Sequence, residues 1–468
     1  MSKQRIFFFS VFLAAGISCC VRAQVKSAWN PDSVVTLPAV EIRGNRLFRI
    51  NGGEIRALEV EKNPAVATGT ASEAFRQLPS LSTDIEGGLL FRGSNRTALL
   101  VNGVPYGLLE ENSGDVLIQL PALFFHSLHL NTAPGTEYMP DGSSALLSLS
   151  SLPAPGSSPL QVTLGGGWHE RYDAGAAWHV EPGRFRIAAR YNYRKEFRDR
   201  TFKKSTADAA GVTRMDNRAS ARPDVHTADL SVSYRLTERD RLSAYGFYYR
   251  MDYSRYGGIH NTRLNAAGAI TNRMLRHRYN DQRQDAYAAE ARWRHIFTFA
   301  DGGSAGSGLE ILFNYNTFSY DEDNRFENEN PADGKIVKQD NQFIDQDKRQ
   351  YYLSAAYYKM FDGGWMLKGG YRGRLLDDRY TALAEDLQAG AWVPNVAKSN
   401  DFTANRTINQ LYASLHKQVG HFHLEGGLQG EWSRQEAKNK EAGRLADDTG
   451  FRVYPQAKLA YKDHAGGS

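Results

Sequence analysis

The stretch from Arg184 to Arg194 reads RFRIAARYNYR, and its side chains alternate between apolar and mostly cationic types. Successive residues of a β-strand point to opposite faces, so this alternation predicts a strand with two different surfaces. One face carries Phe185, Ile187, Ala189, Tyr191 and Tyr193, and the other carries Arg184, Arg186, Ala188, Arg190, Asn192 and Arg194. A strand of about ten residues with one apolar face is typical of a sheet that meets lipid on one side.

The same period of two continues along the second half of the chain. It is seen in His226–Leu236, Ser243–Tyr253, Glu310–Thr317, Trp365–Leu376 and His421–Ser433. Soluble β-sandwiches and propellers are the main alternative, but their strands have about five or six residues. Strands of roughly ten residues match a tilted crossing of a hydrocarbon layer. The sequence therefore predicts a mainly β fold, a transmembrane antiparallel β-barrel.

The connections between these strands alternate in length. The short ones are Glu181–Gly183, Thr237–Asp240, Asp362–Gly364 and Gln418–Gly420. The long polar ones are Lys195–Asp224, Ser254–Gln282, Asp321–Lys348, Asp377–Asn405 and Gln435–Gly450, which we expect to be loops. Short turns on one side and long loops on the other are typical of outer-membrane barrels.

About a dozen strands fit between Leu160 and Tyr461. A barrel of that size is filled by its own side chains, whereas a barrel that encloses a domain has about 22 strands. We therefore expect residues 159–468 to be the N-terminal part of a truncated barrel, with about 12 of an expected 22 strands.

The N-terminus predicts secretion. Lys3 and Arg5 precede the apolar run Ile6–Ile17, and Val21-Arg22-Ala23 offers a cleavage site, so residues 1–23 resemble a signal peptide with Gln24 as the first mature residue. Lipid attachment at Cys19 or Cys20 is the alternative. These are the two cysteines of the chain, so the mature protein should contain no disulfide, zinc-thiolate site or cysteine nucleophile.

The composition fits a strand-built membrane protein. After the signal, no apolar stretch approaches the roughly 20 residues of a membrane helix. A net charge of +5 over 468 residues gives little support for a nucleic-acid partner.

The segment before Leu160 has a mixed pattern. Ala71–Leu78, closed by Pro79, is a short helix candidate. Ala98–Val101 reads as a strand that runs into Asn102-Gly103, and this pair tolerates positive φ and predicts a tight hairpin turn.

The order of the motifs in this first half resembles the plug domain of TonB-dependent outer-membrane receptors. The extended Asp32–Ile42 is similar to the TonB box and the strand that enters the plug, and Ser72–Leu81 is similar to a helix with a Leu-Pro-Gly-Val ending. Arg92-Gly93 and Leu99–Val104 resemble the family's Ile-Arg-Gly and Val-Leu-Ile-Asp-Gly-Val pair. Leu117–Pro121, Ala133–Gly135 and Tyr138–Ala145 resemble the end of the plug, although the family's late Arg-Gly-Pro is Ala-Pro-Gly here.

The resemblance implies a division of the chain. Residues 1–23 would be the signal peptide, 24–50 the TonB-box and linker region, 51–158 an α+β plug domain in the barrel lumen, and 159–468 the barrel. The TonB-binding residues would be Thr36, Leu37, Pro38, Ala39, Val40, Glu41 and Ile42, and the plug motif residues Arg92, Gly93, Asn102 and Gly103.

The resemblance also implies a function in the outer membrane, surrounded by its lipid. The chain would be a receptor for energy-coupled import of a scarce ligand, an iron-siderophore or similar metal chelate. Its partner would be TonB with the inner-membrane ExbB-ExbD complex, with no cofactor and no nucleic acid. The alternative is a surface receptor or adhesin of the same form without transport. An enzyme is not expected, because the sequence has no nucleophile elbow, no carboxylate pair in a motif and no metal-ligand set.

Two further groups of residues need an interpretation. His421 and His423 share one face of a predicted strand, but without a third ligand we interpret them, like His126 and His129, as structural and predict no metal. The arginines on the lumen faces could bind anionic ligands or pair with plug carboxylates, and we favour pairing, because buried charges need partners. Ligand-binding residues are not assigned.

Overall fold

The computed structural model describes residues 49–51, 54–60, 64–84, 87–111, 113–132, 134–138, 145–151, 159–299, 305–440 and 443–461. The chain divides into two units, Met1–Arg46 and Leu47–Ser468, and every described residue lies in the second. The predicted signal peptide and the predicted TonB box Thr36–Ile42 therefore lie outside the described residues. No helix within the described ranges is both long and apolar enough to cross a membrane.

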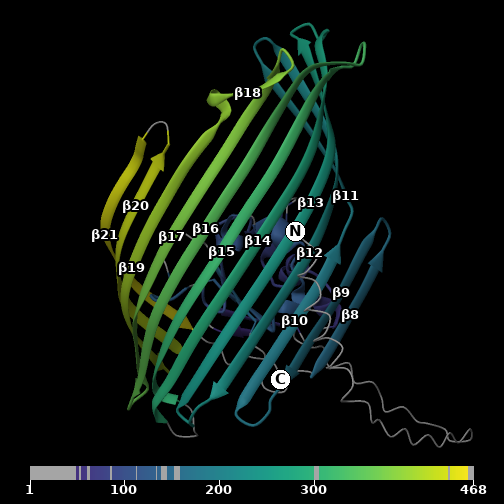
Figure 1. Ribbon diagram of the computed structural model, residues 1–468. Helices are drawn as coiled ribbons and strands as arrows, with labels where there is room; N and C mark the ends of the chain where they lie inside the picture. The colour runs from purple at the N-terminus through teal and green to yellow at the C-terminus, as the bar shows by residue number, and fades with distance from the viewer. Residues whose placement is uncertain are drawn as a thin grey trace, which may run out of the picture. The chain divides into compact units, whose positions relative to one another are not determined.

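A large antiparallel sheet dominates the second unit (Figure 1). Its main path consists of β8 (Leu160–Gly167), β9 (Arg171–Val180), β10 (Phe185–Lys195), β12 (Gly211–Arg235), β13 (Asp240–Asn265), β14 (Ile270–Phe299), β15 (Ala305–Asn330), β16 (Lys335–Phe361), β17 (Trp365–Gln388), β19 (Asn400–Val419), β20 (Phe422–Asn439) and β21 (Gly443–Tyr461). Two further strands, β11 (Arg198–Asp208) and β18 (Ala391–Pro394), pair with β12 and β17, and η5 (Val396–Lys398) follows β18.

Each strand of the path pairs with its neighbour in chain order, so the sheet is an up-and-down meander. Among the described residues this makes a 14-stranded sheet with free edges at β8 and β21, and the barrel is not closed. The expected dozen strands and the open sheet are both confirmed.

The period of two decides which face of the sheet each residue occupies. On β10 the apolar Phe185 and Tyr191 are exposed, while Arg190, Asn192 and Arg194 are buried on the other face. The same division holds on β20, where the exposed side chains are Phe422, Leu424, Leu428 and Trp432 and the buried ones are Glu425, Gln429 and Glu431. A continuous apolar outer face is costly in water and stable in lipid.

The five long connections predicted as loops are largely strand, and that prediction was wrong. The 26 residues of β13 extend over roughly 85 Å at about 3.3 Å per residue, about twice a tilted path across a hydrocarbon core roughly 30 Å thick. The excess forms hairpin arms that end in tight turns, such as the one at Gly334 with φ of 67°. The arms lack hydrophobic alternation because both of their faces meet polar surroundings, so the pattern that reveals a membrane strand is absent there.

Polar cross-strand contacts hold these arms together. Arg276 on β14 forms an ion pair of 2.6 Å with Asp340 on β16 and stacks 3.9 Å from the ring centre of Phe326. Lys338 lies 2.9 Å from Asp386, and its hydrogen bond lowers the pKa of that carboxyl group. The arms are therefore paired sheet rather than irregular loop.

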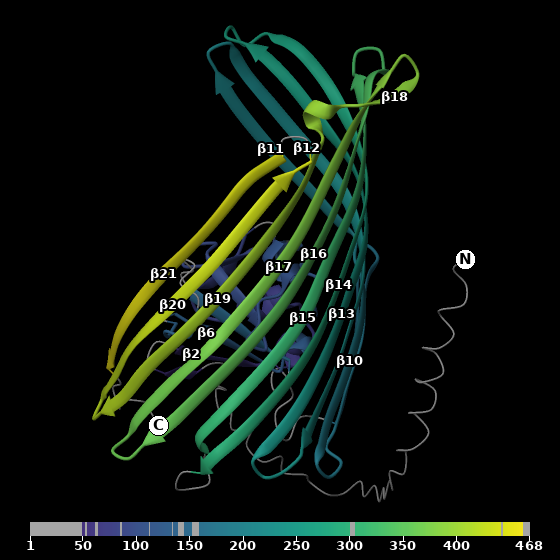
Figure 2. The ribbon, with the colours of Figure 1, turned by 60° about the vertical axis from the view of Figure 1, so that its left-hand side comes forward.

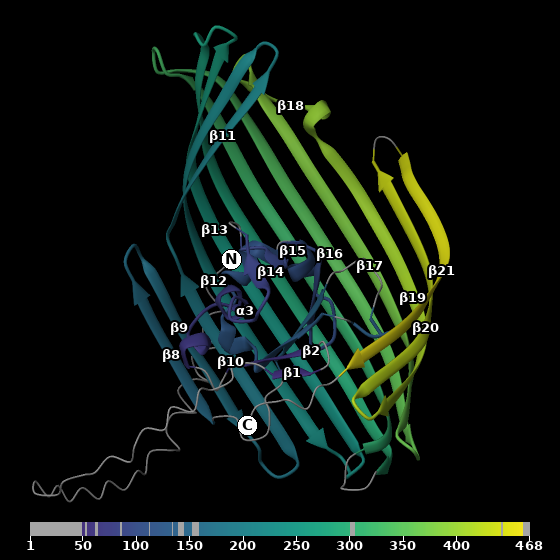
Figure 3. The ribbon, with the colours of Figure 1, turned by 180° about the vertical axis from the view of Figure 1, so that it is seen from behind.

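A smaller unit of mixed structure precedes the large sheet. Its five-stranded sheet has the order β1 (Arg49–Asn51), β2 (Glu54–Glu59), β6 (Ser127–Asn131), β7 (Ala145–Ser150) and β5 (Thr97–Val101), with β5 parallel to β7. Around it lie α2 (Pro64–Ala67), α3 (Ala71–Phe75), the hairpin β3 (Leu81–Thr83) and β4 (Leu89–Phe91), α4 (Gly107–Glu111), α5 (Ser113–Leu117) and η3 (Ala122–Phe124). Figures 2 and 3 show this small unit, which we call the plug, on the concave face of the large sheet, which we call the wall.

Local chemistry explains the elements of the plug. The predicted helix at Ala71 is confirmed, although it ends at Phe75 rather than at Leu78. Thr70 and Glu73 form a reciprocal capping box that fixes its start. Phe75, Leu117, Leu128, Leu130, Leu147 and Leu149 are almost fully buried and form the core of the plug.

Candidate functional site

The plug motif residues form two tight turns of the same kind. At Asn102-Gly103, the N–H of Val101 donates to the Val104 carbonyl oxygen at 2.8 Å, and the N–H of Val104 donates back at 3.0 Å. Asn102 and Gly103 have φ of 52° and 87°, as a type I′ turn requires. The predicted hairpin turn is confirmed.

Arg92-Gly93 repeats this geometry, which sequence reasoning did not anticipate. Phe91 and Ser94 exchange backbone hydrogen bonds of 2.8 and 2.9 Å around it, and the two turn residues have φ of 49° and 82°. The guanidinium of Arg92 lies 4.9 Å from the ring centre of Phe91. An arginine in the left-handed region costs about 1–2 kcal/mol relative to its usual conformation.

Asn102 also connects the plug to the wall. Its side chain donates to Ser151 Oγ at 2.7 Å and accepts from the Ser151 N–H at 2.9 Å. Its carbonyl oxygen accepts a 2.7 Å hydrogen bond from Arg292 on β14. The turn therefore meets both the residue that follows β7 and the wall.

Arg190 provides a second connection from the wall to Ser151. Its guanidinium donates to both carboxylate oxygens of Asp229 on β12 at 2.8 Å, and a further hydrogen bond reaches the Ser151 carbonyl oxygen. The Arg190 and Asp229 side chains are 4% and 0% exposed. A buried ion pair is stable when its geometry is bidentate and further hydrogen bonds satisfy its remaining polar atoms, as the Ser151 carbonyl oxygen does for Arg190.

Arg374 on β17 forms a third connection, to α4 of the plug. It donates to the two carboxylate oxygens of Glu110 at 2.5 and 2.6 Å and to Gln350 Oε1 at 2.7 Å. Gln350 in turn donates to the Pro105 carbonyl oxygen at 2.6 Å. Arg374 and Arg200, which lies 3.4 Å from Asp115, thus pair with plug carboxylates as expected, whereas Arg190 and Arg194 pair with carboxylates of the wall, Asp229 and Asp173.

A cavity of about 900 Å³ lies between the plug and the wall beside these contacts. The plug lines it with residues around β5, including Arg96 and Gly103, and the wall lines it from β16, β17 and β19. Its charged lining residues are the cations Arg96, Lys348, Arg372, Arg374 and Arg406 and the carboxylates Glu110 and Asp378. This volume suits a small-molecule ligand, and the excess of cations favours an anionic one.

A second cavity, of about 740 Å³, lies against the wall farther along the hairpin arms. Seven of its lining residues are carboxylates, namely Asp224, Asp252, Asp281, Asp321, Glu322, Asp323 and Asp345, against the three cations Lys195, Arg222 and Arg283. It contains no plug residue. Of these two cavities, the one of 900 Å³ is therefore the one lined by both the plug and the wall.

Sequence reasoning missed the lining residues Arg96, Lys348 and Arg406, because they come from distant parts of the chain. His421 lies in the turn after β19, with its ring centre 5.8 Å from that of Tyr461. His423 lies on β20, on the face opposite Phe422 and Leu424 as predicted.

The fold is similar to that of solved outer-membrane receptors. The siderophore receptor PiuA from Acinetobacter baumannii superposes with a TM-score of 0.52 at 13% identity, covering 84% of this chain and 60% of PiuA. Two others match with lower TM-scores: the ferric citrate transporter FecA (0.38, 11% identity, 90% of this chain and 80% of FecA) and the ferric yersiniabactin uptake receptor FyuA from Yersinia pestis (0.37, 10% identity, 86% and 78%). No curated protein sequence matches the chain.

The similarity to PiuA establishes the fold alone, and the chain spans less than two thirds of PiuA. Residues 301–465, from β15 to β21, match the Outer membrane protein beta-barrel family. The chain thus has the plug-and-barrel fold of the TonB-dependent outer-membrane receptors, built on an outer-membrane β-barrel wall.

Proposed function

We propose that the chain is a TonB-dependent outer-membrane receptor that imports an anionic metal chelate such as a ferric siderophore. The observation that carries this proposal is the 900 Å³ cavity between plug and wall, in which five cations face two carboxylates. PiuA, whose fold this chain shares, is a siderophore receptor. A chelate held there would lie against both the part that blocks the lumen and the part that surrounds it.

The proposal requires energy from outside the outer membrane, which holds no ATP. Thr36–Ile42 would couple the receptor to this energy by pairing as an extended β-strand with TonB, which the ExbB-ExbD complex energises. The proposed division of the chain is signal peptide 1–23, TonB-box region 24–50, plug 51–158 and wall 159–468. A pull on the TonB box would reach the plug through its first strands.

The plug–wall contacts set the work that such movement needs. Arg190, Arg292 and Arg374 attach the plug through hydrogen bonds and ion pairs. Water can replace such contacts at a cost of about 1.5–3 kcal/mol for each hydrogen bond to a charged group. Apolar side chains of the plug also pack against the wall, as Tyr106 does against Phe247 with ring centres 6.2 Å apart, and their exposure to water adds to that cost. Displacing the plug would therefore require the energy that TonB supplies.

The cavity is tested by ligand binding. We expect the double substitution Arg96→Gln and Arg406→Gln to weaken the binding of radio-iron-labelled ferric citrate and a ferric catecholate to intact cells. Arg325→Gln is the matched control, because Arg325 pairs with Asp323 on an exposed hairpin arm. Binding that survives the double substitution unchanged would remove the cavity from the proposal.

The energy coupling is tested by uptake. Val40→Pro removes a backbone donor from any strand added to TonB, so we expect uptake to stop while binding persists. Val40→Ile keeps that donor and should transport normally. Equal uptake by the proline variant and the parent would move the TonB box upstream to Asp32–Val35. Binding without TonB-dependent uptake in the parent itself would favour the receptor or adhesin alternative.

A further inference from the structure

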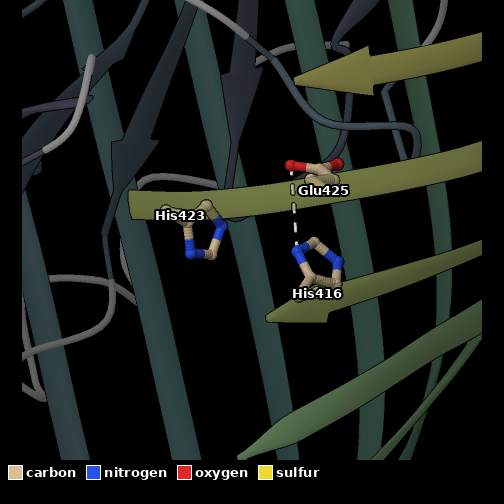
Figure 4. Close-up of side chains that lie close together, drawn as sticks. All are labelled: His416, His423 and Glu425. Carbon is tan, nitrogen blue, oxygen red and sulfur yellow. Dashed lines mark ion pairs between the residues drawn. The ribbon is translucent and has the colours of Figure 1, made fainter. Parts of the chain in front are cut away.

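Three potential metal ligands meet on the lumen face of the hairpin formed by β19 and β20. They are His416 on β19 and His423 and Glu425 on β20, and Figure 4 shows the two rings and the carboxylate turned toward a common point. One ligand atom from each lies within 4.8 Å of the other two. His416 and Glu425 are buried and His423 is half-buried, so the cluster is enclosed but reachable from solvent.

The register of the hairpin creates this cluster. His416 is the direct cross-strand partner of Glu425, and Gln418 is the partner of His423. His423 therefore lies diagonal to His416, and the ring centres are 5.9 Å apart. Directly opposite and diagonal positions on one face are the pairs whose side chains reach each other in an antiparallel sheet.

His416 already has the orientation of a metal ligand. Its Nε2 is 2.9 Å from Ser414 Oγ, and its Nδ1 faces Glu425 Oε2 at 3.8 Å. Histidine ligands in metal sites use one nitrogen for the metal and bind an oxygen atom through the other, which fixes the ring. Ser414 occupies that second position here.

Glu425 is held in the same manner, and from the plug. Its Oε1 accepts a 3.2 Å hydrogen bond from the N–H of Thr136, so Oε2 is the oxygen directed to the histidines. Gly427 permits this approach, because a Cβ there would lie 2.3 Å from Thr136 Oγ1. Gln456 donates to the Pro134 carbonyl oxygen of the same plug segment at 2.7 Å, and Gln429, with its amide oriented to donate, reaches the Thr136 carbonyl oxygen at 3.0 Å.

Two carboxylates and two lysines lie around the histidines of the cluster, so its surroundings carry no excess positive charge against a cation. Lys368 on β17 forms a 3.5 Å ion pair with Glu137 of the plug, and Lys458 on β21 is the direct cross-strand partner of Glu425. Glu137 offsets Lys368, and a bound cation would compete with Lys458 for the Glu425 carboxylate.

We propose that His416, His423 and Glu425 bind one divalent transition-metal cation, with Zn²⁺ the best fit, and that the bound ion fixes Glu425 for its contact with plug residue Thr136. Two imidazoles and one carboxylate with an open fourth position form a ligand set of zinc sites. Tetrahedral bonds of about 2.0–2.1 Å place neighbouring ligand atoms roughly 3.4 Å apart. The present separations therefore contract by small side-chain rotations when the ion binds.

The site is tested on the receptor extracted from outer membranes of cells that produce it, without a polyhistidine tag. Isothermal titration with ZnCl₂ and elemental analysis after dialysis should give one Zn²⁺ per chain. His416→Ala, His423→Ala and Glu425→Gln should each weaken binding by at least about tenfold, and Ser414→Ala by about 10–100-fold through loss of the orienting oxygen. His421→Ala is the matched control, because this histidine lies in the adjacent turn outside the cluster.

Two further measurements separate the site from its alternatives. Co²⁺ should give the visible absorption of a four-coordinate ion without a thiolate band, because the two cysteines of the chain are Cys19 and Cys20. Zn²⁺ should slow hydrogen exchange at the Thr136 amide in the parent and leave it unchanged in His416→Ala. Undiminished Zn²⁺ affinity in the double variant His416→Ala and His423→Ala, or no saturable binding by the parent, overturns the site. Unchanged exchange at Thr136 in the zinc-loaded parent overturns the link to the plug.

Discussion

Arg374 on the wall and Glu110 on the plug form an ion pair in which one guanidinium nitrogen, Nη2, contacts both carboxylate oxygens, at 2.5 and 2.6 Å. The residues are 264 positions apart in sequence. Their side chains are 10% and 34% exposed, so the pair is only partly shielded from solvent. It fixes the short helix α4 against β17 at the border of the cationic cavity.

Removing this pair should loosen the plug without unfolding the wall. We expect Arg374→Met to raise the hydrogen-exchange rate of the α4 amides by an amount equivalent to about 1.5–3 kcal/mol, the range for hydrogen bonds to charged groups. The control is Arg325→Met, which breaks an exposed pair with Asp323 and should cost less than about 1 kcal/mol. Equal effects of the two substitutions would show that Arg374 does not hold the plug.

The turn at Asn102-Gly103 should be sensitive to backbone strain alone. Gly103 has φ of 87°, and no atom lies within 4 Å of a Cβ built there. Gly103→Ala should therefore destabilise the turn by about 1–2 kcal/mol through its conformation, not through a clash. Gly166→Ala on β8 is equally open without a positive φ and should have little effect. Exchange rates of the Val104 amide, and of the amides beside Gly166, measure the two costs.

The Arg190–Asp229 pair should be among the most costly contacts to break. Because both side chains are almost fully buried, Asp229→Ala leaves an unpaired buried charge, and we expect a loss of about 3–5 kcal/mol in the local stability of β10 and β12. Asp252→Ala removes the partner of Arg250 in a half-exposed pair and should cost less than about 1 kcal/mol. Native-state hydrogen exchange of the β10, β12 and β13 amides compares the stability losses of the two variants. Similar losses in Asp229→Ala and Asp252→Ala would contradict the role of Asp229 as the partner of a buried charge.

The open edges of the wall lead to a prediction about assembly. Strands β8 and β21 have no further partner in the described sheet, and each unpaired backbone group in lipid costs several kcal/mol. Residues 24–468 refolded alone into lipid vesicles, unlike the receptor assembled in outer membranes that the ligand and zinc tests use, should therefore not form a heat-modifiable, protease-resistant barrel. A heat-modifiable band on gel electrophoresis, protected from protease, would show that these edges close on each other.

The sequence alone was sufficient to predict the two faces of a strand where apolar and polar side chains alternate along it. In Arg184–Arg194 the apolar residues face outward and the cations inward as predicted, because lipid accepts only the first set. The Asn102-Gly103 turn was equally predictable, because this residue pair is the one that type I′ turns prefer, whereas Arg92-Gly93 and His169-Glu170, which also adopt two successive positive φ values, carry no such signal. The hairpin arms of β12 to β17 could not be predicted from the sequence, because their strands stay paired beyond the point where hydrophobic alternation stops.

The cluster of His416, His423 and Glu425 shows most clearly what the sequence could not predict. The sequence placed His423 and Glu425 on one face but centred the turn on Gln418–Gly420, which would set His416 opposite Phe422. In the structure Gly420 and His421 form the turn, and His416 lies opposite Glu425 instead. A shift of this size changes which face and which partner each side chain meets.

The sequence thus determined the class of fold, the face that each residue of the membrane strands occupies and the turn at Asn102-Gly103, because these depend on near neighbours in the chain. The tertiary structure alone decided strand register, the pairing of Arg374 with Glu110, the cavity between plug and wall, and the meeting of His416, His423 and Glu425. These depend on contacts between distant residues, and their geometry follows from pairing offsets and turn centres that residue type does not specify.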